Sequence, residues 1–118
     1  LVSEKGGRDD DEFIQTSAAS LWTVAMRLRR SSGSPHLLNS LKRRPSKHGD
    51  RLSGAHLVWT HETGEQTEAY LFANADGTTD VYAHYETSVD QPLAHLTDTQ
   101  HDGDRRGVVR EALAETQQ

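Results

Sequence analysis

Apolar positions near the start of the chain recur at intervals of three and four residues, as on one face of an amphipathic helix. This face comprises Ile14, Ala18, Leu21, Ala25 and Leu28. Acids precede the run and arginines end it, so the charges suit the dipole of a helix. The acids are residues 9–12, and the arginines are Arg27, Arg29 and Arg30. The pattern predicts a long helix over residues 11–30 and gives the arginines a structural reason for their position.

A second, shorter helix is predicted after the Ser-Ser-Gly break that follows. Ser34 suits an N-cap, and Pro35 suits the first helical position, where its missing N–H costs nothing. The buried side of this helix would comprise Leu37, Leu38 and Leu41. The helix should end near Arg44, because Pro45 disfavours helical geometry in the residue before it.

The middle of the chain has the pattern of three β-strands. The segments AHLVWTH, TEAYLFANA and TDVYAHYETS are rich in β-branched and aromatic residues. Thr63-Gly64 and Asp76-Gly77 separate them, and glycine readily takes the positive φ of a tight hairpin loop. The strands, at residues 55–61, 66–74 and 79–87, are predicted to form an antiparallel meander.

Loop length decides which side chains share a face of this meander, because one extra residue turns every following side chain over. Two-residue loops gather apolar side chains on one face: Leu57, Trp59, Tyr70, Phe72, Val81, Ala83 and Tyr85. A longer second loop gives a face on which single-stranded nucleic acids could stack, with Trp59, Tyr70, Phe72, Tyr82 and His84. The first register is favoured because it places the most apolar area on one side.

These elements predict a single α+β domain over residues 11–115. It is a three-stranded antiparallel β-meander packed with a long N-terminal helix, a short second helix and a C-terminal helix. In chain order its parts are helical (11–44), a basic loop (45–54), the meander (55–87), a polar connection (88–103) and a helix (104–115). We expect a flexible leader at residues 1–10 and a frayed tail at residues 116–118.

Composition narrows the classes of function. The chain has no cysteine, which excludes disulfides, thiolate metal sites and cysteine nucleophiles. No apolar run approaches the ~20 residues of a membrane-spanning helix. We therefore expect no membrane contact and a place in the cytoplasm or within a macromolecular assembly. The ten arginines against three lysines suit a high-GC or halophilic source.

Charge is divided unevenly along the chain. Residues 1–51 carry ten bases and six acids, whereas residues 52–118 carry three bases and twelve acids. No acid occurs from Phe13 to Gly49. A basic belt lies in this stretch and just after it, with Asp50 as its one acid. Its members are Arg27, Arg29, Arg30, Lys42, Arg43, Arg44, Lys47 and Arg51. Such a belt indicates an anionic partner, or neutralisation by the acidic half of the same chain or of a second copy.

Metal and cofactor sites find little support in the sequence, although the chain has seven histidines. His56 and His61 are five apart on a predicted strand and would face opposite sides, and His84 completes no ligand set with them. Residues 98–104 begin like a calcium loop, but its twelfth position is Val109, where a bidentate glutamate is needed. We expect no metal site and no cofactor.

Catalytic motifs are also lacking. Asp80 and Glu86 lie six residues apart on one strand, which would separate them by roughly 20 Å, too far for an acid/base pair. The chain contains no nucleophile elbow, P-loop or dinucleotide-binding fingerprint. The sequence therefore does not predict an enzyme.

The basic belt remains as the candidate site. Its members with a candidate binding role are Arg29, Arg30, Lys42, Arg43, Arg44, Lys47 and Arg51. They predict a small non-enzymatic binding module that contacts a polyanion, most simply the backbone of a nucleic acid. The alternative is an assembly, adaptor or structural protein whose basic belt docks on an acidic protein surface. The partner would then be another protein or a second copy of this chain in a homo-oligomer.

Overall fold

The fold is built on five antiparallel strands in the order β1-β7-β6-β5-β2. The computed structural model describes residues 11–39, 41–86 and 105–116. The main sheet contains β1 (Glu12–Ser17), β2 (His36–Leu38), β5 (Ala55–Thr60), β6 (Gln66–Ala73) and β7 (Thr79–Glu86). A separate two-stranded sheet contains β3 (Arg43–Arg44) and β4 (Arg51–Leu52), and the helices are α2 (Leu21–Arg29) and α4 (Gly107–Thr116).

The predicted helix over residues 11–30 is wrong in its first half. Glu12–Ser17 forms β1 and pairs with β7, and only Leu21–Arg29 is helical. The backbone N–H and C=O groups along one edge of β7 find their hydrogen-bond partners in β1, and they would lack these partners if residues 12–17 were helical. This gain outweighs the apolar spacing that suits a helix. Ile14 still packs against the core, but it does so from the strand.

The predicted second helix is also wrong, because residues 36–38 and 43–44 are strands. Ser34 has a φ of +50°, so it turns the chain instead of capping a helix. His36–Leu38 then pairs with β5 and gives that strand its second neighbour. The predicted basic loop contains β4, which pairs with β3.

The three strands of the expected meander are present as β5, β6 and β7, close to their predicted positions. They form only part of a larger sheet, so the predicted fold class, a three-stranded meander with three helices, is wrong. The predicted polar connection, residues 88–103, lies outside the described parts of the chain. The same holds for the predicted leader, residues 1–10, and for residues 117–118 of the predicted tail.

The favoured register of the meander is wrong, because each loop is one residue longer than expected. Trp59 pairs with Thr67, and Tyr70 pairs with Tyr82. The alternative register correctly placed Tyr82 and His84 beside Tyr70, but Trp59 lies on the opposite face. The second loop uses Gly77, whose φ of +90° favours glycine.

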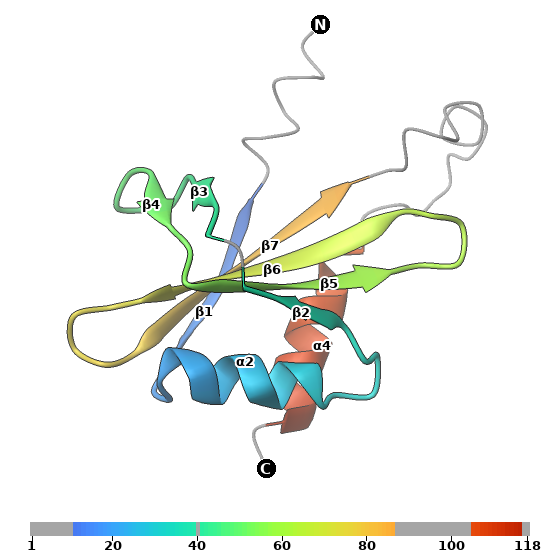
Figure 1. Ribbon diagram of the computed structural model, residues 1–118, viewed down its shortest axis with the longest axis horizontal. Helices are drawn as coiled ribbons and strands as arrows, with labels where there is room; N and C mark the ends of the chain where they lie inside the picture. The colour runs from blue at the N-terminus through green and yellow to red at the C-terminus, as the bar shows by residue number, and fades with distance from the viewer. Residues whose placement is uncertain (1–10, 40, 87–104, 117–118) are drawn as a thin grey trace, which may run out of the picture.

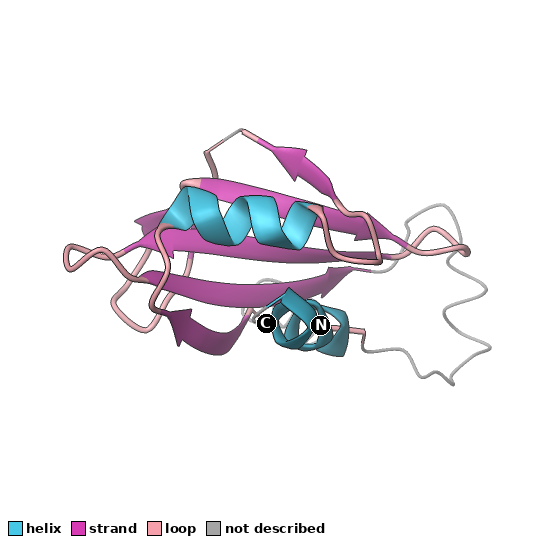
Figure 2. Ribbon diagram, turned by 90° about the horizontal axis from the view of Figure 1, so that it is seen from below, coloured by secondary structure: helices cyan, strands magenta, loops and turns pink. Residues whose placement is uncertain are grey.

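Both helices cover one face of the sheet (Figures 1 and 2). The core on this side comprises Leu21, Val24, Ala25 and Leu28 of α2, Val109, Ala112 and Leu113 of α4, and alternate residues of β5, β6 and β7. Gly33 lies so close to the Trp59 ring that a Cβ there would be 2.8 Å from Nε1. Because successive side chains of a strand point to opposite faces, the remaining side chains of β5, β6 and β7 lie on the other face of the sheet.

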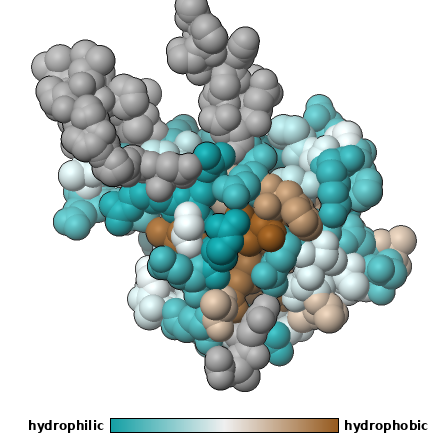
Figure 3. All heavy atoms as spheres, turned by 180° about the vertical axis from the view of Figure 1, so that it is seen from behind, coloured by the Kyte–Doolittle hydropathy of each residue, from teal (hydrophilic) through white to brown (hydrophobic). Residues whose placement is uncertain are grey.

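The outer surface is largely polar, as the mean hydropathy of −0.79 leads one to expect. From behind, apolar residues gather near the middle of the molecule and hydrophilic residues surround them (Figure 3). Neither described helix is long and apolar enough to cross a membrane.

Candidate binding surface

The second face of the sheet carries a buried aromatic cluster. Tyr70, Phe72 and Tyr82 form it, and all three side chains are almost fully buried. Phe72 and Tyr82 meet edge to face, with ring centroids 5.4 Å apart, and Phe13 of β1 meets Tyr82 at the same distance. This small second core needs a cover, because the helices lie on the opposite face.

The cover is the basic hairpin, defined here as residues 42–53 and containing β3 and β4. It lies on the side of the sheet opposite α2 (Figure 1). Arg44 pairs with Arg51 in the hairpin ladder, and both side chains turn toward the sheet. The Arg44 guanidinium carbon lies 4.7 Å from the centre of the Tyr70 ring, and that of Arg51 lies 5.0 Å from the Phe72 ring. These cation–π contacts close the aromatic cluster.

The turn of the hairpin is fastened at Lys47. Its ammonium lies 3.8 Å from the centre of the Phe13 ring, and its backbone N–H donates to the Tyr82 hydroxyl at 2.7 Å. The buried phenol oxygen thus has a hydrogen-bond partner, as a buried polar group requires.

Asp11 anchors one end of the hairpin. It accepts two hydrogen bonds from Arg44, from Nη2 at 2.6 Å and from Nε at 2.9 Å, and its side chain is 1% exposed. His84 of β7 places Nδ1 2.9 Å from the same carboxylate. Burial raises the pKa of Asp11, but hydrogen bonds and positive charge from His84 and Arg44 outweigh it, so the pKa lies below its usual value.

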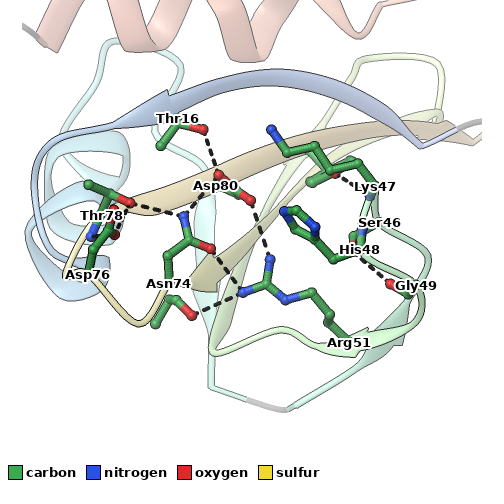
Figure 4. Close-up of polar contacts among 12 residues, drawn as sticks. Thr16, Ser46, Lys47, His48, Gly49, Arg51, Asn74, Asp76, Thr78 and Asp80 are labelled. Atoms are coloured by element: carbon green, nitrogen blue, oxygen red, sulfur yellow. Dashed lines mark hydrogen bonds and ion pairs between the residues drawn. The ribbon is translucent and has the colours of Figure 1, made fainter.

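Asp80 anchors the other end. Figure 4 shows its carboxylate between β1 and the hairpin, within reach of Thr16, Asn74 and Arg51. Thr16 Oγ1 donates at 2.6 Å and Asn74 Nδ2 at 3.0 Å to Oδ1, and Arg51 Nη1 donates at 3.3 Å to Oδ2. Arg51 also donates to the backbone carbonyl of Ala73 at 3.0 Å. Burial raises the pKa of Asp80, but these hydrogen bonds and the nearby cations outweigh it, so the pKa is lowered.

The two aspartates should make the hairpin sensitive to acid. Their pKa values are lower in the folded than in the unfolded chain, so their stabilisation is complete above the usual value near 3.8. It should be lost as the pH falls through the lower folded values. Urea unfolding from pH 7 to pH 2.5 should therefore show a falling free energy of unfolding below about pH 4. The fall should be smaller in Asp11→Asn and Asp80→Asn, and an unchanged slope in both variants would contradict the assignment.

The outward side of the hairpin combines positive charge with apolar surface. Arg43 pairs with Leu52, and alternation turns both side chains away from the sheet. Leu52 is 47% exposed, and Leu41, two residues before Arg43, is 59% exposed. Within the described parts of the chain, Arg43 forms no ion pair, in contrast to Arg44 and Arg51.

The structure divides the basic belt between the two sides of the molecule. Arg29 and Arg30 lie at the end of α2, which packs on the helix-covered face. Lys42, Arg43, Arg44, Lys47 and Arg51 all lie on the hairpin, over the opposite face. The seven candidate residues are therefore not one surface, and two of them, Arg44 and Arg51, hold internal carboxylates.

Sequence reasoning missed Asp11 and Asp80 as the partners of the belt. Asp80 did carry a signal, since it is an acid within the apolar, aromatic strand segment TDVYAHYETS. An acid in such a strand needs a partner if it is buried. Asp11 carried no comparable signal, because it stands in a run of acids that suits a helix start.

A groove lies beside the hairpin on the same face of the sheet, with a volume of about 360 Å³. His36 and Leu38 of β2, Lys42 of the hairpin and alternate residues of β5 and β6 line it. Lys42 therefore brings a positive charge to this groove.

Comparison with protein-family models, curated proteins and solved structures finds no match to this chain.

Proposed function

We propose that this chain is a non-enzymatic adaptor domain that docks its basic hairpin on an acidic and partly apolar surface of another protein. The observation that carries the proposal is the position of Arg43 beside two half-exposed leucines, Leu41 and Leu52. Arginine next to apolar surface is typical of protein interfaces, where charged residues other than arginine are depleted. Phosphate groups, in contrast, give exposed leucines nothing to contact.

The way the hairpin is held supports this role. Arg44 and Arg51 fix it to the sheet through buried carboxylates and aromatic rings. A surface that is ordered before binding loses less conformational entropy on association. The same contacts give Asp11 and Asp80 a structural task, which supports a binding role over catalysis.

Nucleic-acid binding is the second candidate. Lys42, Arg43 and Lys47 are exposed cations within six positions of one hairpin, and such a group suits a phosphate backbone. While the hairpin covers the sheet, contact would be limited to the sugar-phosphate backbone of the nucleic acid. The aromatic side chains Tyr70, Phe72 and Tyr82 are enclosed and cannot stack on bases.

Two probes separate the candidates: a 20-residue peptide that alternates glutamate with leucine, and single- and double-stranded oligonucleotides. An adaptor should bind the peptide saturably, and both Leu52→Ser and Arg43→Gln should weaken that binding about five- to tenfold. Arg29→Gln, on the opposite side of the sheet, is the matched control and should change nothing.

The contrary result is equally specific. If only the oligonucleotides bind, and affinity falls with Arg43→Gln but not with Leu52→Ser, the adaptor proposal is wrong and nucleic-acid binding is supported. Failure to bind the peptide at all also contradicts the adaptor role.

A further inference from the structure

Three basic side chains, those of His36, His56 and Lys42, line the groove beside the hairpin. His36 pairs with Val58, and Leu38 pairs with His56, so His36 and His56 are diagonal neighbours on one face of β2 and β5. Lys42 enters the same groove from the hairpin. Its position is fixed by backbone contacts, because its N–H donates to Ser53 Oγ at 3.3 Å and its carbonyl accepts from the Ser53 N–H at 2.8 Å.

The other end of the groove is neutral and polar. Thr60 pairs with Gln66 there, and both residues line the groove. Val58, directly opposite His36, adds apolar surface. The groove therefore has basic side chains toward Lys42 and neutral hydrogen-bonding groups toward Thr60.

One acid, Glu68, also lines the groove, and its carboxylate is bonded to a neighbouring side chain. Glu68 pairs with Val58 in the ladder and accepts a hydrogen bond from the Tyr70 hydroxyl. Burial lowers the pKa of Arg44, but the hydrogen bonds and charge of Asp11 outweigh it, with a smaller contribution from Glu68. The acid that lines the groove is therefore bonded to the Tyr70 hydroxyl, over whose ring Arg44 lies.

We propose that this groove binds a small phosphorylated molecule with a polar body. Lys42 and the exposed His36 would hold the phosphate, whereas His56, 2% exposed, forms part of the wall. Thr60 and Gln66 would bond to hydroxyl groups at the far end. Lysine binds phosphate as a point charge, and an imidazole N–H donates a single hydrogen bond. The volume lies at the lower end of the usual range for small-ligand pockets.

The test uses the full chain, with glycerol 3-phosphate as the ligand probe. Two-dimensional NMR should show saturable shifts of the His36 and His56 ring signals and of the Thr60 and Gln66 signals, with a Kd of about 1 mM or lower. Lys42→Gln should weaken binding of glycerol 3-phosphate about tenfold.

Arg43→Gln is the matched control, because Arg43 is the next residue in the chain and points away from the groove. It should leave the affinity for glycerol 3-phosphate unchanged, as should Leu52→Ser, so this result is independent of the adaptor role. Shifts that do not saturate, or an affinity unaffected by Lys42→Gln, would overturn the proposal. An equal loss with Arg43→Gln would overturn it too, since it would indicate attraction by overall charge.

Discussion

Replacing Phe72 with alanine should lower the free energy of unfolding by about 3–5 kcal/mol, the usual range for a buried phenylalanine. Phe72 is 0% exposed and is among the largest fully buried side chains of the described chain. Its ring supports Tyr82 edge to face, with centroids 5.4 Å apart, and carries the Arg51 guanidinium 5.0 Å above it. The substitution therefore leaves a cavity and removes the surface on which the hairpin rests.

The loss should include the hairpin as well as the sheet. Urea unfolding measures the total, and amide hydrogen exchange at Ser53, whose N–H donates to the Lys42 carbonyl, measures the hairpin. Trp22→Ala is the control for loss of an aromatic ring, because Trp22 is 50% exposed and should cost well under half as much. A change below about 1 kcal/mol in Phe72→Ala, or unchanged exchange at Ser53, would show that the hairpin does not depend on this cluster.

The sheet was the part of the fold most open to prediction from sequence. β5, β6 and β7 are adjacent in the chain and joined by short loops, so local patterns determine them. Their register was not predictable in the same way, because it depends on one residue in each loop. Trp59 illustrates this, since its face is decided by its pairing with Thr67 and by the α2 side chains it meets.

The two edge strands were not predictable from local pattern. β1 pairs with β7, more than sixty positions away in the chain, and His36–Leu38 is only three residues long. The backbone groups of these edge strands gain hydrogen-bond partners only when the central strands are present. The residues within each edge strand therefore give no indication of this pairing. The apolar spacing of Ile14 and Leu21 was compatible with a helix although the two residues belong to different elements.

The candidate site was predicted in part. The cations of residues 42–51 do lie together, because a hairpin keeps neighbours in sequence close in space. The division of the belt could not be foreseen, since the positions of Arg29 and Arg30 depend on which face α2 covers. The roles of Arg44 and Arg51 depend on Asp11 and Asp80, which contact them across the sheet.

Removing the carboxylate of Asp80 should also be strongly destabilising. Asp80→Ala should cost about 2–3 kcal/mol, because the loss of one partner leaves a charge and two hydrogen-bond donors without their acceptor. The value lies below the 3–5 kcal/mol typical of a fully buried pair, because the Arg51 side chain is 22% exposed and can be partly hydrated. Arg51→Ala should cost less than Asp80→Ala, since Thr16 and Asn74 still bond to the carboxylate.

The double variant separates the ion pair from these other contacts. Asp80→Ala with Arg51→Ala should cost at least about 1 kcal/mol less than the sum of the single losses at pH 7. The same cycle on the surface pair of Glu12 and Arg110, 41% and 56% exposed at 3.2 Å, should give a coupling well under 1 kcal/mol. Coupling at Asp80 should disappear below the folded pKa of the carboxyl, where protonation removes the charge that Arg51 contacts. If the two losses at pH 7 simply add, Arg51 does not hold the hairpin through Asp80, and its other contacts, the hydrogen bond to the Ala73 carbonyl and the cation–π contact with Phe72, account for the docking.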